Sequence, residues 1–260
     1  MNKELKVALL QSNLAWENPE ENRRNFGQKI KNTSDSVDII ILPEMFTSGF
    51  TMNASSVAET MDGMTISWLK ELASEKNTAI TGSLVISENN TFYNRLVFVH
   101  PNGHVDTYDK RHTFTLAGEH KIYISGTSKT IIDYKGWKIC PLICYDLRFP
   151  VWARNVNDYD LLLYVANWPK PRISAWDALL KARAIENMSY CIGVNRIGLD
   201  ANQNEYPGHT ACYDVLGEKL TGFIPNEDST EVVVLDKSHV QKYRNKLNFL
   251  NDRDDFNLLK

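Results

Sequence analysis

Three reactive side chains follow closely on apolar stretches of this sequence. Glu44, Lys110 and Cys144 each lie within two residues of the end of such a stretch. If the stretches are strands of α/β sheets, their carboxyl ends are where ligand sites gather. A carboxylate, an amine and a thiol at one such edge form a coherent set for nucleophilic catalysis.

The chemistry of the three side chains suits attack on an amide or a similar carbon. A thiolate is a strong nucleophile, and a nearby carboxylate can take the thiol proton and later give it to a leaving amine. An ammonium group holds the carboxylate in place, favours the thiolate, and adds positive charge where an oxyanion develops. The backbone N–H of Tyr145, directly after the cysteine, is the natural second donor to that oxyanion.

Each of these residues also has an ordinary interpretation. Most buried cysteines only pack, Glu44 could cap the loop or helix after Pro43, and most lysines are solvated. A rival mechanism also fits, because His112 lies two residues from Lys110. A cysteine–histidine dyad would leave Glu44 largely dispensable.

The segment around Cys144 predicts a buried strand that ends in a turn. Residues 137–143 are almost continuously apolar, as in a strand covered on both faces. Asp146 is a candidate N-cap for a short helix, and Pro150 suits a first helical turn. The turn would lift the sulfur out of the sheet and point the following N–H groups at the group it attacks.

Hydrophobic periodicity predicts the elements that must position these residues. We expect strands at residues 6–12, 37–42, 79–86, 92–100, 104–108, 130–134, 137–143, 160–166, 190–194, 211–215 and 231–235. We expect helices at residues 19–34, 65–77, 151–157, 174–187 and 238–248, the last too charged for a core and suited to a surface or a subunit contact. Residues 49–63 and 109–125 and the loop between 194 and 211 read as irregular.

The order of these elements predicts an α/β fold in which helices cover sheets within one domain, residues 1–260. A strand–helix–strand pattern occurs near both 7–42 and 161–194, which would suit two similar layers packed on each other. The chain has 260 residues, 43% of them hydrophobic, and this suits one large domain.

Charge and cysteine usage exclude several classes of protein. The net charge is −3 with no basic block, so we expect no nucleic-acid partner. We find no run of uncharged apolar residues long enough for a membrane span and no signal-peptide pattern, so we expect a cytoplasmic protein with free thiols.

Cys140 and Cys144 are spaced C-x3-C with no histidine-rich segment to complete a zinc site, so we expect neither a metal nor a cofactor. We expect Cys140, Cys191 and Cys212 to pack in the core.

Three sequence blocks resemble the signatures of the nitrilase, or carbon–nitrogen hydrolase, superfamily. They are LPEMF at 42–46, YDKRH at 108–112 and CYDLRFP at 144–150, in the order Glu, Lys, Cys. The resemblance covers nearly the whole chain and implies an α-β-β-α sandwich, with Glu44 as general base, Lys110 as oxyanion-stabilising cation and Cys144 as nucleophile. The family's second glutamate matches Glu119, with the implied role of positioning Lys110; the alternative is an ordinary loop carboxylate.

Further segments resemble the bacterial omega-amidase branch of this superfamily. They are FPVW at 149–152, ANWPKPR at 166–172, ARAIEN at 182–187 and NRIG at 195–198. Many relatives in other branches carry Glu where this sequence has Val151. Members of this branch hydrolyse the terminal amide of 2-oxoglutaramate and 2-oxosuccinamate, and relatives are usually dimers or larger. Two other enzymatic readings are an N-carbamoyl amidohydrolase and a nitrilase. A non-enzymatic reading is a binding module whose cysteine senses redox state.

A keto-acid amide carries a carboxylate, so its pocket needs a cation or amide donors. Arg172, in the WPKPR loop, is our candidate for that contact. Arg148 is the weaker candidate, because an arginine this close to a turn often forms a structural ion pair. Trp168 and Phe46 could form apolar walls of the pocket or belong to the core.

Overall fold

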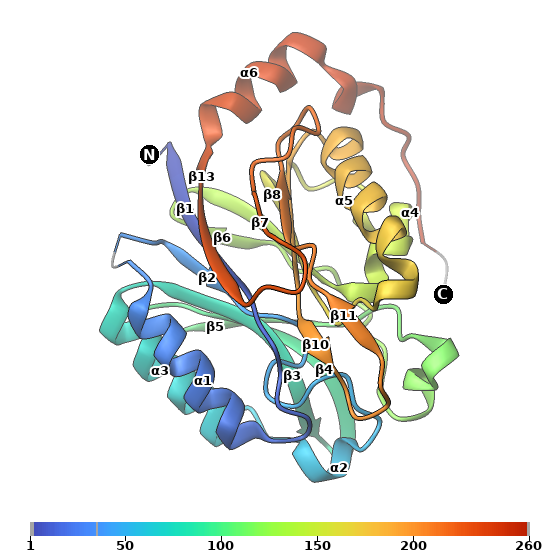
Figure 1. Ribbon diagram of the computed structural model, residues 1–260. Coiled ribbons are helices and arrows are strands. Elements are labelled where there is room, and N and C mark those ends of the chain that lie inside the picture. Colours follow the sequence, from blue (N-terminus) through green and yellow to red (C-terminus); the bar gives the residue numbers. More distant parts are fainter. Residues whose placement is uncertain (1–2, 35, 259–260) are drawn as a thin grey trace.

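Two β-sheets pack face to face, and helices cover the outer face of each (Figure 1). The computed structural model describes residues 3–34 and 36–258. The layers therefore run helix, sheet, sheet, helix, which confirms the predicted α-β-β-α sandwich.

The first sheet has six strands in the order β13-β1-β2-β3-β4-β5. Their bounds are Glu4–Gln11 (β1), Ile39–Ile41 (β2), Ala79–Glu88 (β3), Thr91–Val99 (β4), Val105–Asp109 (β5) and Ser229–Asp236 (β13). β1, β2 and β3 run parallel, while β4, β5 and β13 pair antiparallel to their neighbours. Helices α1 (Pro19–Asn32) and α3 (Met64–Lys76) pack on its outer face through Phe26, Ile30, Ile66 and Leu69.

The second sheet has five strands in the order β12-β9-β8-β7-β6. Their bounds are Ile132–Tyr134 (β6), Trp137–Ile143 (β7), Leu161–Ala166 (β8), Tyr190–Asn195 (β9) and Ala211–Tyr213 (β12). β7, β8 and β9 run parallel, and α5 (Ile173–Asn187) covers their outer face through Trp176 and Leu180. The remaining elements are α2 (Ala54–Val57), α4 (Pro150–Ala153), α6 (Lys237–Leu247) and the hairpin β10 (Ile197–Leu199) with β11 (Glu205–Pro207).

The main core lies between the two sheets. Leu5, Val7 and Leu9 of β1 belong to this inner core, while Ala8 and Leu10 belong to the cluster under α1 and α3. This alternation follows from the two-residue period of a strand. Both pairs β1–β2 and β8–β9 are parallel strands joined by one helix, so the predicted similarity of residues 7–42 and 161–194 is confirmed.

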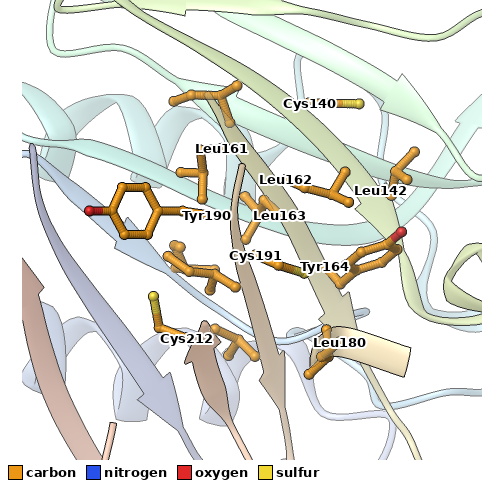
Figure 2. Packing of buried hydrophobic residues seen from close by; sticks show 14 of the residues in the cluster. Cys140, Leu142, Leu161, Leu162, Leu163, Tyr164, Leu180, Tyr190, Cys191 and Cys212 are labelled. Carbon is orange, nitrogen blue, oxygen red and sulfur yellow. The ribbon is translucent and has the colours of Figure 1, made fainter. Parts of the chain in front are cut away.

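Three of the four cysteines are core residues, as predicted. Figure 2 shows Cys140, Cys191 and Cys212 among leucine and tyrosine side chains, and each is completely buried. Burial raises the pKa of the Cys140 thiol to about 12, so this sulfur stays protonated and inert near neutral pH.

Four local predictions are wrong. The polar stretch predicted as a loop between 194 and 211 contains the β10–β11 hairpin, and the irregular stretch 49–63 contains α2. The helix predicted at 151–157 is only Pro150–Ala153, because Asn155 exchanges hydrogen bonds with the backbone of Tyr159 and turns the chain. Asp146 is no N-cap of a later helix, since it lies inside a 3-10 helix that begins at Cys144.

No helix in the two described ranges is long and apolar enough to cross a membrane.

Candidate active site

The carboxyl ends of strands from both sheets meet at one buried site. Glu44 follows β2, Lys110 follows β5, and Cys144 follows β7 of the other sheet. All three side chains are buried. The Lys110 Nζ lies 2.8 Å from the Glu44 Oε1, so the three segments predicted to converge do converge.

Amide groups hold the Glu44 carboxylate in one orientation. The Asn94 side chain donates to its Oε1 at 2.8 Å, and the Asn167 backbone N–H donates to its Oε2 at 2.8 Å. Ser83 donates to the other end of the Asn94 amide at 2.8 Å, which fixes that amide's direction. These donors fix the direction of both carboxylate oxygens, as a general base requires.

Glu119 holds the amine of Lys110 from the other side. The Lys110 Nζ lies 3.0 Å from both carboxylate oxygens of Glu119, and Glu119 is completely buried. Burial raises the pKa of Glu119, against the opposing effect of the ammonium group. Burial alone would lower the pKa of Lys110, but the two neighbouring carboxylates outweigh it and raise this pKa above its usual range. Lys110 is therefore a fixed cation.

The Cys144 thiol is protonated at rest. Burial raises its pKa well above the usual value, and the neighbouring Glu44 charge adds to the rise. Lys110 lowers this pKa, as predicted, but burial and the two carboxylates beside the lysine outweigh its effect. Proton transfer from sulfur must accompany the attack.

The backbone at the nucleophile is turned sharply. Cys144 has a φ of 43°, which is uncommon outside glycine, and it opens the 3-10 helix Cys144–Arg148. The N–H of Tyr145 lies in the first turn of this helix, where backbone N–H groups have no carbonyl partner within the helix. It is thus placed as an oxyanion donor beside the sulfur, and Tyr145 itself lines the pocket.

A pocket of about 570 Å³ opens in front of these groups. Its floor includes Lys110, Cys144 and Asn167, and its walls include Trp168 and Phe50. Trp168 is 3% exposed and belongs to the core cluster as well as lining the pocket, so both interpretations offered for it hold in part. Phe50, whose ring centre is 5.1 Å from the Lys110 Nζ, is a wall residue that we did not predict.

Two guanidinium groups line the pocket without a carboxylate partner in residues 3–34 and 36–258. Arg148 stacks on the Trp168 ring at 4.9 Å, and Arg172 stacks on the Phe114 ring at 5.2 Å. The interpretation of Arg148 as a structural ion pair is therefore wrong. Together the two groups form a positive side of the pocket, whereas the charge of Lys110 is outweighed by its two carboxylate neighbours.

Phe46 is not a wall of the pocket. Its side chain is completely buried and packs edge-on against Phe26 at 5.7 Å, in the cluster beneath α1 and α3. Met45, with a φ of 44°, reverses the chain between the two residues, so that Glu44 reaches the site and Phe46 reaches the opposite face of the sheet. Asn94 and Asn167, which hold Glu44, were not predicted. Asn167 lies in the ANWPKPR segment, which indicated the branch of the family but not a contact with Glu44.

His112 is placed away from the thiol. Its Nδ1 lies 2.7 Å from the Asp146 Oδ1, and its ring stacks on Phe149 with centres 3.6 Å apart. His112 does not line the pocket that contains Cys144. The geometry thus gives no support to a cysteine–histidine dyad.

One group in the described part of the chain could hold a metal ion. His100, His104 and Asp106 bring ligand atoms within 4.8 Å of one another. They lie at the start of β5, whereas Lys110 lies beyond its end. The expectation that the protein binds no metal stays a prediction.

A double-sheet sandwich with Glu, Lys and Cys at strand ends defines a class of amide-hydrolysing enzyme. The family model for carbon-nitrogen hydrolase matches residues 6–245, so the chain belongs to this family. Omega-amidase YafV of Escherichia coli is 42% identical over 254 residues, which cover 98% of each chain. The 2-oxoglutaramate amidase of Bacillus subtilis is 32% identical over 82% of this chain and 84% of its own length. A CN-hydrolase superfamily protein of Xanthomonas campestris, whose structure carries an arsenic adduct in the active site, is 39% identical with a TM-score of 0.96, covering 99% of this chain and 100% of that one.

Proposed function

We propose that this protein is an omega-amidase, which hydrolyses the terminal amide of 2-oxoglutaramate or 2-oxosuccinamate to the dicarboxylate and ammonia. The observation that carries this proposal is a pocket lined by Lys110 and Cys144, with Glu44 buried behind the lysine, together with two guanidinium groups that have no carboxylate partner among the described residues. The relatives named above support the choice of substrate.

Acylation begins with attack of the Cys144 sulfur on the amide carbon. Glu44 takes the thiol proton as the C–S bond forms, because burial raises the pKa of the thiol and favours its protonated form. The Lys110 ammonium and the Tyr145 N–H stabilise the oxyanion. Glu44 then gives its proton to the leaving nitrogen, the C–N bond breaks, and ammonia leaves a thioester on Cys144.

Deacylation repeats the same steps with water. Glu44 removes a proton from a water molecule that attacks the thioester carbon, and the C–S bond breaks. The proton returns to the sulfur, and the second carboxylate of the product is released. Glu119 acts by holding Lys110 through its two 3.0 Å contacts while the charge on the substrate oxygen develops.

The pocket's positive side supports the proposed choice of acidic amides as substrates. The substrate's own carboxylate lies at the end remote from the scissile amide, and Arg172 or Arg148 can pair with it. A guanidinium binds a carboxylate through two parallel hydrogen bonds, which orients the substrate as well as attracting it.

The alternative enzymatic functions are hydrolysis of an N-carbamoyl compound or of a nitrile. A carbamoyl substrate would release carbon dioxide together with ammonia, which an omega-amide does not. A redox-sensing thiol needs a depressed pKa and good exposure, whereas Cys144 has a raised pKa and is buried. Stoichiometric thiol labelling without ammonia release would favour that reading.

The direct test is ammonia release from a panel of omega-amides, N-carbamoyl compounds and nitriles, with Cys144→Ser as control. We expect release from 2-oxoglutaramate and 2-oxosuccinamate, far above the other classes, and none from the variant. Release from nitriles or carbamoyl compounds alone would overturn the proposal.

We further propose a homodimer of single-domain chains acting in the cytoplasm. The family resemblance supports the dimer, and the exposed charged helix α6 is a candidate contact. Free cysteines, typical of a reducing compartment, support the location. Light scattering at micromolar concentration tests the dimer, and a monomer mass of 29.7 kDa would contradict it.

A further inference from the structure

The carboxylate of Asp146, which lies two residues after the nucleophile in the same 3-10 helix, is completely buried. Its Oδ2 accepts from the Tyr108 hydroxyl at 2.8 Å and from the Ile143 N–H at 3.1 Å. Its Oδ1 accepts from the His112 N–H at 2.9 Å and contacts the His112 Nδ1 at 2.7 Å. One carboxylate thus engages four polar groups.

These four groups belong to the two segments that carry the amine and the thiol. Tyr108 and His112 flank Lys110 by two residues on either side, at the end of β5 of the six-stranded sheet. Ile143 is the last residue of β7 of the five-stranded sheet and directly precedes Cys144. Asp146 therefore ties the two sheets together at the point where the lysine and cysteine meet.

We propose that Asp146 is a positioning residue that sets the placement of the Lys110 amine relative to the Cys144 sulfur. The inference rests on the proposed function, since it assigns the residue a task in that reaction. Asp146 does not line the substrate pocket, so it acts only through the two segments that it joins.

The arrangement requires a carboxylate and not merely a polar side chain. The Tyr108 hydroxyl already accepts from the Trp152 indole N–H at 2.9 Å and from the Arg111 N–H at 3.2 Å, so its own hydrogen points to Asp146. Burial, and then the neighbouring Asp146, raise the pKa of Tyr108 well above its usual value, which keeps that hydrogen in place. An asparagine would place its NH2 group at one of the two oxygen positions and lose the backbone contact made there, either with the Ile143 N–H or with the His112 N–H.

The test compares Asp146→Asn, Tyr108→Phe and Asp160→Asn. Asp160 is a matched control, because it is also buried, accepts from the Lys138 N–H at 3.0 Å and from the Lys237 amine at 2.8 Å, and lies at the other end of β8 from the site. We expect Asp146→Asn to lower kcat for 2-oxoglutaramate about 100-fold, the scale of a 1 Å misplacement, and to change KM less than about threefold. Tyr108→Phe, which loses one of four contacts, should lower kcat less, and Asp160→Asn should lower Tm without changing kcat.

A second readout separates this inference from the proposed function. Cys144 modification by a neutral thiolsulfonate, followed against pH, needs no substrate, and its profile should shift in Asp146→Asn and in Tyr108→Phe but not in Asp160→Asn. If the wild-type protein released no ammonia from any omega-amide, the proposed function would be contradicted. The modification profiles would still decide the role of Asp146. Unchanged kcat and superimposable profiles in Tyr108→Phe, or in a folded Asp146→Asn, would overturn the inference.

Discussion

At the scale of single residues, the site is built around a neutral thiol and not an ion pair. The charges of Glu44, Glu119 and Lys110 leave a net negative environment beside the sulfur. Such an environment, with burial, keeps the proton on Cys144 until a substrate carbon is in place. The thiol is thereby protected from unwanted oxidation between turnovers.

This state of the thiol predicts an unusual pH dependence of its chemical modification. A raised pKa means less thiolate at any given pH, so the modification rate at pH 8 should be low and should still rise above pH 9. Neutral methyl methanethiolsulfonate, with Cys144→Ser to subtract labelling elsewhere, measures this rate. A rate that levels off by about pH 8.5, the usual cysteine pKa, would contradict the account.

The pocket's two guanidinium groups predict a selective effect on acidic substrates. Arg172→Ala should raise KM for 2-oxoglutaramate roughly 10- to 100-fold, as expected for a lost hydrogen bond to a charged group. The rate of acylation by an uncharged ester should change far less. The same two measurements on Arg148→Ala compare the other guanidinium group of the pocket with Arg172. Equal losses on both substrates would show that Arg172 has a structural role.

The sequence was sufficient to locate Glu44, Lys110 and Cys144, which meet at the site, and insufficient to locate the residues that shape the pocket. Glu44, Lys110 and Cys144 follow apolar strands, and both periodicity and the family blocks locate them. The prediction for Phe46 was wrong because the chain turns at Met45, where φ is 44°. A turn of this kind cannot be recognised from the pattern of hydrophobic residues. The pocket face of Phe50 depends on tertiary packing, which local patterns do not encode.

At the scale of elements, the strands were predicted well and the short polar elements were not. The β10–β11 hairpin is built from a turn in which the Asp200 Oδ1 accepts from the Asn202 and Asn204 N–H groups, at 2.8 and 2.9 Å. All three residues line the pocket. Because the stretch is rich in Asn and Gln and lacks an apolar alternation, it resembled an irregular loop.

The packing of α5 on the second sheet predicts a pair of contrasting glycine variants. A Cβ on Gly193 of β9 would lie 2.5 Å from the Leu180 Cδ1 and 2.6 Å from the Trp176 Cζ2, so Gly193→Ala must push the helix away. We expect a loss of about 1–3 kcal/mol of unfolding free energy, the range for overpacked cores. Gly222→Ala is the control, since its nearest neighbour would be 3.9 Å away. Denaturant unfolding measures both, and equal stabilities would contradict the packing described.

At the scale of the whole molecule, the sandwich brings together side chains that no single sheet could. The six-stranded sheet supplies Glu44 and Lys110, and the five-stranded sheet supplies Cys144 and Asn167. The inner core between the sheets therefore fixes the geometry of the reaction. The fold class followed from the alternation of strands and helices together with the family blocks, whereas the pairing of the two sheets at the site required the structure.

The activity of Cys144→Ala on 2-oxoglutaramate, measured as ammonia release beside Cys140→Ala, tests the central claim most directly. Both thiols are buried and lie four positions apart, but only Cys144 faces the pocket. The account predicts a loss of roughly 10⁴-fold or more for Cys144→Ala, the scale seen when a nucleophile is removed, and near wild-type activity for Cys140→Ala. Ammonia release by Cys144→Ala at the wild-type rate would contradict it.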